Sequence, residues 1–360
     1  MLGWNDNGDI TTSKPTIGGI FRLYNATGTA ITSEIVPATS ALNTGSQKAL
    51  LSDISPLTGG SFITFWTASV VSASTNLPTN NILYAQTYDS GGQKTGSDKL
   101  LLSSSYKYIK DIKVKNLTSG GFLANWSSYA DSSLNAPVTY KAQVLDSQLN
   151  TSGTEFEIGS PVGQKVFTYS LAGLTNSEIM VVKNADTKGD ITNASITAQK
   201  YSASGLKSSS EITLVPNCPC TPVITALSGS NFALAWENYE SVSGVTTNTG
   251  ISVQIFNSQG IALSSQINAA STSGARYTPN IISLNNSNFV VIWMDANNIL
   301  NGQIFDSSGL KIGTEFTITS DVGLITPVGI SSTNDGGFVV DWGYDYYNYL
   351  NGIKAKIYSR

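Results

Sequence analysis

The chain has 360 residues, a formal net charge of -4 and only 12% charged residues. Its hydrophobic fraction of 40% is spread along the whole chain, which excludes intrinsic disorder. It contains no Lys/Arg run, which argues against a nucleic-acid partner, and no apolar stretch long enough to span a bilayer.

An internal repeat organises the chain and is read most easily from tryptophan. Each tryptophan ends a short run of mostly hydrophobic residues, such as the run from Phe338 to Trp342. Between Trp126 and Trp236 the same run returns as Ile179-Met180-Val181-Val182-Lys183, with Lys183 in the tryptophan position. Seven copies follow one another at spacings of 49 residues (Trp293 to Trp342) to 62 residues (Trp4 to Trp66). All six tryptophans end the same short pattern: Trp4, Trp66, Trp126, Trp236, Trp293 and Trp342.

Each copy alternates with period two, as a β-strand does. In the last copy Phe338, Val340 and Trp342 share one face. The opposite face is also apolar in several copies, for example at Val290 and Ile292. A strand that is apolar on both faces lies between two layers, so the tryptophans are predicted to be core residues.

A second pattern follows each tryptophan strand: a strand, a turn and another strand, with no insertion across the frame. The first strand of this second pattern, which we call the Gln strand, carries one residue at an equivalent position in each unit: Arg22, Gln86, Gln143, Gln199, Gln254, Gln303 or Lys356. Six residues later stands the turn residue, which is Gly28, Gly92, Leu149, Gly205, Gly260 or Gly309. Asp or Asn opens the turn and can bond its own backbone, while glycine takes the positive φ that such a hairpin needs. Six residues further stands Glu34, Asp98, Glu155, Glu211, Gln266 or Glu315.

The predicted fold is all-β: a seven-unit tandem repeat forming a single β-propeller domain over residues 1–360, with seven blades. Each unit holds a leading strand, a Trp strand, a Gln strand and a Glu strand. The first unit lacks a leading strand and the last lacks a Glu strand, so we expect another segment or a neighbouring copy to complete these blades. The alternative is that residues 354–360 pair with the first strands and seal a monomer. The unit boundaries are 1–40, 41–104, 105–160, 161–216, 217–270, 271–320 and 321–360.

The motif "Gly-Gly-Phe-Val-Val-x-Trp … Ala-Gln-x-Phe-Asp-x-x-Gly … Gly-x-Glu-Phe" resembles repeats of large secreted and surface proteins of microbes. Some of those proteins also carry calcium-binding RTX repeats. The resemblance covers nearly the whole chain and implies β-propeller-like modules at the cell surface. The chain departs from the motif at Leu149 and Lys183 and has no glycine-aspartate nonapeptide array.

The composition also limits the chemistry. The chain has no histidine, which excludes the usual Ser-His-Asp and Cys-His sets and disfavours a zinc hydrolase. A glycosidase needs only two carboxyl groups, so the composition does not exclude it. The acidic residue of the Glu strand recurs in most repeat units. A catalytic pair should occur once in the chain, so we interpret these acids as structural residues.

Three groups of residues are candidate sites. Two loops could bind Ca²⁺ or be ordinary polar turns: Asp6 with Asp9, and Asp186 with Asp190. Four tyrosines crowd one Trp-to-Gln loop and either bind a glycan or protein partner or pack on a neighbouring unit: Tyr344, Tyr346, Tyr347 and Tyr349. Cys218 and Cys220 are either a local disulfide or two unrelated thiols.

The sequence predicts a secreted or cell-surface module that is not an enzyme. No cofactor is expected beyond Ca²⁺ at those loops. It would bind protein or glycan at the loops of variable length, or assemble head to tail into a filament through its terminal strands. The alternative is a carbohydrate-active propeller enzyme or lectin. Asn-x-Ser/Thr sequons fit a glycoprotein, although a chain rich in Ser, Thr and Asn produces them by chance: Asn25, Asn116, Asn125, Asn150, Asn193 and Asn285.

Overall fold

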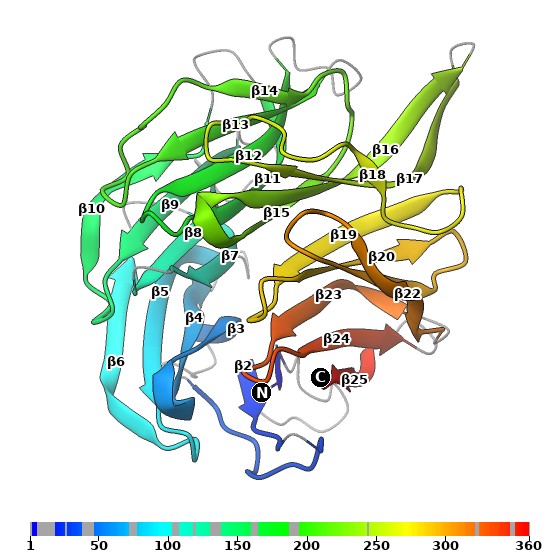
Figure 1. The fold of residues 1–360 in the computed structure, drawn as a ribbon. Coiled ribbons are helices and arrows are strands. Elements are labelled where there is room, and N and C mark those ends of the chain that lie inside the picture. Colours follow the sequence, from blue (N-terminus) through cyan, green and yellow to red (C-terminus); the bar gives the residue numbers. More distant parts are fainter. Residues whose placement is uncertain are drawn as a thin grey trace. The chain divides into compact units, whose positions relative to one another are not determined.

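The alternating patterns fold into antiparallel β-strands throughout (Figure 1). In the described part of this computed structural model there is no α-helix, and the only helical turns are 3₁₀ segments at η2 (Thr58–Gly60) and η4 (Ser228–Ser230). The structure describes residues 2–5, 19–25, 27–37, 47–71, 78–102, 108–117, 120–129, 138–159, 165–186, 194–242, 245–320, 324–345 and 350–359.

The chain divides into two compact units, and the first comprises Met1–Gly159 with Ala203–Gly205. A two-stranded sheet comes first, made of β1 (Leu2–Asn5) and β2 (Gly19–Arg22). The next sheet is β3 (Gln47–Pro56), β4 (Phe62–Val71), β5 (Pro78–Tyr88) and β6 (Lys94–Leu102). The third is β7 (Tyr108–Asn116), β8 (Phe122–Tyr129), β9 (Val138–Leu145) and β10 (Thr151–Glu157).

The second unit comprises Ser160–Ser202 with Leu206–Arg360 and holds four sheets. The first is β11 (Lys165–Gly173), β12 (Ile179–Asp186), β13 (Ser195–Tyr201) and β14 (Ile212–Val215). Next come β15 (Pro222–Ala226), β16 (Phe232–Val242), β17 (Val245–Phe256) and β18 (Ile267–Asn268). Then follow β19 (Arg276–Ser283), β20 (Phe289–Asp295), β21 (Leu300–Phe305) and β22 (Lys311–Thr319). The last sheet is β23 (Leu324–Ser332), β24 (Phe338–Asp345) and β25 (Leu350–Tyr358).

Six of these sheets are β-propeller blades of three or four strands joined in chain order, so the prediction of seven blades is wrong. Within the described residues, the first repeat unit forms the β1–β2 pair and single bridges, such as Phe21 to Ile35. The physical reason is that β1 and β2 have four residues each, and the segment after the β2 turn pairs with them by isolated bridges in place of a ladder. The last blade has three strands in the described residues, and completion of its edge by another chain remains a prediction.

The predicted core residues are confirmed wherever their side chains are described. Trp66, Trp126, Trp236, Trp293 and Trp342 are all buried. Four of them pack against the preceding blade of their own unit: Trp126 on β4 and β5, Trp236 on β12 and β13, Trp293 on β16 and β17, and Trp342 on β20 and β21. Burial of a large aromatic between consecutive sheets supplies the main apolar contact that holds one blade to the next.

The predicted turn chemistry is also confirmed. Asp306 Oδ1 accepts hydrogen bonds from the backbone N–H groups of Ser308 and Leu310, both at 2.9 Å. Gly309 has a φ of 91°. Leu149 takes the same left-handed region at a φ of 64° and buries its side chain in the core, which explains how leucine replaces glycine there.

The recurring glutamines and acids are structural. Gln303 Nε2 donates to the carbonyl oxygens of Ile304 at 2.9 Å and Ile312 at 3.0 Å, which ties the Gln strand to the Glu strand. Gln86 and Gln143 make the equivalent bonds. The acids bind different local partners from unit to unit: Glu34 to Arg22, Asp98 to Lys94, Glu155 to Lys141, Glu211 to Lys183 and Glu315 to Ser271.

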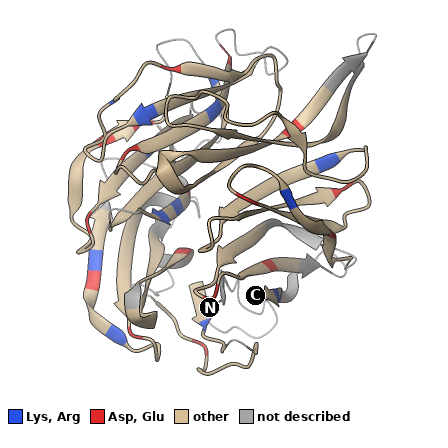
Figure 2. Ribbon diagram, in the orientation of Figure 1, with Lys and Arg blue, Asp and Glu red and all other residues tan. Residues whose placement is uncertain are grey.

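Charged residues are sparse and of mixed sign along the ribbon (Figure 2). No helix in the described residues is long and apolar enough to cross a membrane.

Candidate functional site

The residue that follows each central tryptophan, or Lys183 in its place, occupies an equivalent position in every blade. Alternation along the strand turns this residue away from the tryptophan face, and the strand continues beyond it, to Val71 in β4 and to Val242 in β16. In four consecutive blades it is polar yet at most 8% exposed: Thr67, Ser127, Asn184 and Glu237. Glu237 is the only carboxylate of the four.

Glu237 is held by groups from two blades of the second unit. Its Oε1 accepts a hydrogen bond from the Thr278 backbone N–H at 2.9 Å, and its Oε2 accepts one from the Tyr239 hydroxyl at 3.1 Å. Thr278 lies in a β-bulge between Tyr277 and Asn280, which removes its N–H from the strand ladder. The bulge therefore turns one backbone donor towards the carboxylate.

Thr278 has a φ of 50°, which is unusual for a β-branched residue. The same conformation occurs at Asp111, in the bulge of β7, where φ is 53°. There Asp111 accepts a hydrogen bond from Ser127 Oγ at 3.0 Å. The bulge thus belongs to the repeat, and what distinguishes the Glu237 site is the acid on the Trp strand.

Tyr239 and Tyr277 give this site two phenol rings. Burial raises the pKa of the Tyr239 hydroxyl, and the negative charge of Glu237 raises it further. Tyr239 therefore stays protonated at neutral pH and donates to Glu237. Tyr277 is 39% exposed, so part of its side chain is open to solvent.

An amide joins the same two blades beside the carboxylate. Asn248 Oδ1 accepts a hydrogen bond from the Arg276 N–H at 3.0 Å, and its Nδ2 donates to the Arg276 carbonyl at 2.6 Å. The side chain thus replaces a strand partner for Arg276. Because both ends of the amide are used, the spacing between β17 and β19 is fixed at this edge of the site.

The Cys218–Cys220 disulfide lies next to this site and is buried. The Cys218 carbonyl accepts a hydrogen bond from Asn184 Nδ2 at 2.5 Å, and Cys218 Sγ lies 3.8 Å from the Glu237 carbonyl oxygen. The segment between β14 and β15 is therefore anchored between the polar residues of two Trp strands.

The other predicted site residues are only partly placed. Tyr344 stands in β24. Asp186 is a buried residue at the end of β12. The remaining candidates lie outside the described residues: Tyr346, Tyr347, Tyr349, Asp6, Asp9 and Asp190. Within the part of the chain that the structure describes, no group of three or more Asp, Glu or Cys side chains could hold a metal ion. The Ca²⁺ loops stay predictions.

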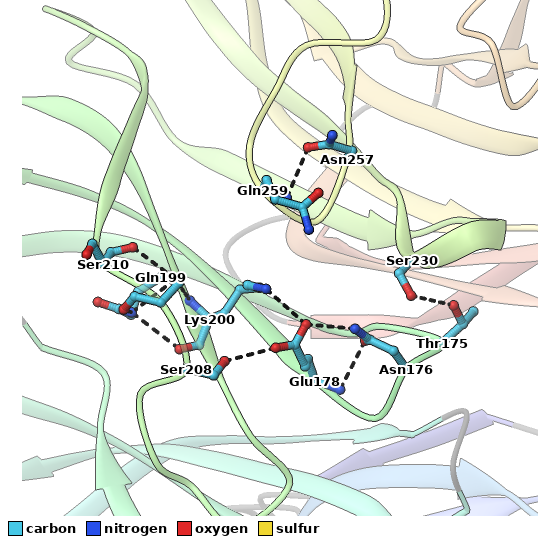
Figure 3. A network of polar contacts seen from close by, with 11 residues as sticks. Thr175, Asn176, Glu178, Gln199, Lys200, Ser208, Ser210, Ser230, Asn257 and Gln259 are labelled. Atoms are coloured by element: carbon cyan, nitrogen blue, oxygen red, sulfur yellow. Dashed lines mark hydrogen bonds and ion pairs between the residues drawn. The ribbon is translucent and has the colours of Figure 1, made fainter.

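A second polar cluster lies at the other end of β12, around Glu178 (Figure 3). Glu178 accepts hydrogen bonds from Asn176 at 2.7 Å, Lys200 at 3.1 Å and Ser208 at 3.1 Å. Burial acts to raise its pKa, but these three donors outweigh burial and the pKa lies below its usual value. A carboxylate so fully bonded ties the β11–β12 turn to β13 and the segment after it, and serves as a structural comparison for Glu237.

No protein-family model matches the chain, and no curated protein matches it in sequence. Solved structures resemble it in fold. An α-L-arabinanase of Penicillium chrysogenum in complex with arabinobiose has a TM-score of 0.53 at 11% identity, covering 85% of this chain and 92% of that one. A polysaccharide lyase, the PL25 ulvan lyase bound to a GlcA-Rha3S saccharide, has a TM-score of 0.53 at 9% identity, covering 95% and 87%. At these identities the likeness shows the β-propeller fold alone.

These comparisons overturn the prediction that the chain is not an enzyme, because both propellers of similar fold are named as carbohydrate-cleaving enzymes. The prediction gave too much weight to the missing histidine, since glycoside cleavage is carried out by carboxyl groups. Sequence reasoning also passed over Glu237. The available signal was the polar residue one place after Trp66, Trp126, Lys183 and Trp236, with Glu237 the single acid among the four.

Proposed function

We propose that this chain is a carbohydrate-active β-propeller enzyme that binds and cleaves a polysaccharide around Glu237, at the boundary between the β15–β18 and β19–β22 blades. The observation that carries the proposal is the pair of Glu237 and Tyr239, joined by one hydrogen bond of 3.1 Å. Both side chains lie in β16, before the strand ends at Val242, and they face groups of β19 across the boundary between the two blades.

The pair offers one carboxylate and one phenol. The Glu237 carboxylate can accept a proton or stabilise positive charge at the sugar, and the protonated Tyr239 hydroxyl can donate to a substrate when that bond replaces its bond to Glu237. The exposed Tyr277 ring fits the apolar face of a sugar, and Asn248 and Arg276 fix the edge of the site. Propellers of the same fold include enzymes named for arabinan and ulvan, which makes neutral and acidic plant or algal polysaccharides the first substrates to test.

The proposal also covers location. A buried disulfide persists in an oxidising compartment, and a polysaccharide-cleaving enzyme works where its polymer is found. We therefore place the chain outside the cell or on its surface, in keeping with the microbial surface repeats that its motif resembles.

The test is a screen of the purified chain against arabinan, ulvan and a panel of other polysaccharides. New reducing ends and unsaturated sugar products are followed separately, because they distinguish hydrolysis from lysis. Wild type should release products from at least one polymer, and Glu237→Gln should not. Binding without cleavage by both proteins would indicate a lectin and reject the enzymatic part of the proposal.

A further inference from the structure

Five aliphatic side chains project from the hairpins that join the Gln and Glu strands in the second unit. They stand one or three residues after the turn glycine in three consecutive blades, and each is between 41% and 65% exposed. Large aliphatic side chains gathered on a surface are uncommon unless something covers them. They are Leu206, Ile261, Leu263, Leu310 and Ile312.

The fold does not require apolar residues at these positions. The blades β3–β6 and β7–β10 carry Gln93, Thr95, Asn150 and Ser152 there. The first repeat unit has Thr29 and Ile31, so only one of its two positions is aliphatic. Both types of hairpin form the same turn, so the aliphatic tips have no structural cause within the repeat.

The three tips lie in a row along one rim. A Cβ at Gly260 would overlap the side chain of Ile212, so this turn sits directly on the Glu strand of the preceding blade. A Cβ at Gly309 would likewise lie 3.3 Å from the side chain of Ile255 and 3.5 Å from that of Ile267, both in the preceding blade. Each hairpin thus rests on its neighbour, and the exposed side chains follow one another from blade to blade.

We propose that this rim is a peripheral membrane-binding surface that inserts its five aliphatic side chains into an anionic lipid surface. Within residues 206–208, 261–263 and 310–312 the only charged side chains are Lys207 and Lys311. The nearby Asp306 carboxylate is bonded into its own turn. Aliphatic side chains at the hairpin tips can insert among the lipids, and the neighbouring lysines are attracted to anionic headgroups. A protein hot spot would favour Trp, Tyr or Arg, which these tips lack.

The experiment is co-sedimentation of the full chain with vesicles of phosphatidylcholine alone, or with about one third phosphatidylserine. Wild type should bind the anionic vesicles more tightly, and salt should weaken binding. The triple variant L206S/I261S/L310S should lower the partition coefficient by about tenfold or more. Leu100→Ser, which removes an exposed leucine from β6, should have no effect.

Two results would overturn the inference. One is the absence of wild-type binding to either vesicle. The other is concentration-dependent self-association that the triple variant abolishes, because the rim would then join copies of this chain. Should the triple variant fail to fold, hydrogen exchange of wild type decides: anionic vesicles should protect residues 205–212 and 260–267, and unchanged exchange there rejects the surface.

Discussion

Lys183 Nζ lies 2.7 Å from the Glu211 carboxylate, in the place where five of the other repeat units bury tryptophan with its side chain described. Lys183 is only 1% exposed, and burial lowers its pKa while Glu211 opposes that effect. An acid that recurs in the repeat has here become the counter-ion of a core lysine. The third blade thus keeps the β-strand pattern but exchanges an aromatic contact for an ion pair.

This pair predicts an asymmetric response to mutation. Glu211→Gln leaves a buried ammonium without its counter-charge and should lower the free energy of unfolding by about 3 kcal/mol. The double variant Lys183→Met, Glu211→Gln removes both charges and should lie within about 1 kcal/mol of wild type. Urea unfolding measures both. Equal losses in the single and double variants would show that the charge pairing is unimportant.

Trp236 predicts the cost of losing one inter-blade contact. Trp236→Ala should lower the free energy of unfolding by about 3–5 kcal/mol, because the side chain fills the core between β16 and the β12–β13 strands. Trp236→Phe keeps most of the apolar volume and should cost much less. Thermal and urea unfolding give the two values, and unchanged stability of the alanine variant would contradict the core assignment.

Asp53 predicts a pH dependence of stability. Burial raises its pKa from 3.8 to about 6, although the Val114 and Ile54 N–H groups and two lysines act in the opposite direction. A raised folded-state pKa means that the folded chain holds this proton more tightly than the unfolded chain. The stabilisation is therefore complete below pH 3.8 and is lost as pH rises through about 6.

The check is urea unfolding from pH 4 to 7 for wild type and Asp53→Asn. The asparagine variant cannot titrate, so the decrease assigned to Asp53 should vanish from its profile. Its overall stability should also fall, because asparagine offers one acceptor oxygen where Asp53 bonds the N–H of Ile54 at 2.8 Å and that of Val114 at 2.7 Å. If the free energy of unfolding changed with pH in the same way in both proteins, the pH dependence would belong to other groups.

The Cys218–Cys220 bridge should act locally. It closes a very short loop, so its removal in Cys218→Ser, Cys220→Ser should cost only about 1–2 kcal/mol of global stability. The larger change is expected in hydrogen exchange at residues 194–196 and 217–221, whose hydrogen bonds converge on this segment. Unchanged exchange there would show that the backbone bonds hold the segment without the bridge.

The repeat frame, the all-β class, the buried tryptophans and the turn chemistry could be predicted because each depends on local pattern: period two, positive φ and Asx bonding. The number of blades could not be predicted in this way. Trp4 has its strand motif, yet in the described residues its unit forms the β1–β2 pair and isolated bridges in place of a blade, which the local pattern does not reveal. The Glu237 site was missed for a related reason. It depends on a bulge at Thr278 in the next blade, which no local pattern around Glu237 reveals.

The central claim is that Glu237 is the catalytic carboxylate of a carbohydrate-active β-propeller. The most direct measurement compares the cleavage rates of wild type, Glu237→Gln and Glu178→Gln on the first polysaccharide found to be a substrate. Glu178 is the matched control, because it is a hydrogen-bonded glutamate just before β12, in the preceding blade, and belongs to a separate polar cluster. We predict that Glu237→Gln lowers kcat by about a hundredfold or more with polymer binding retained, while Glu178→Gln keeps the wild-type rate. Equal rates for wild type and Glu237→Gln would contradict the assignment.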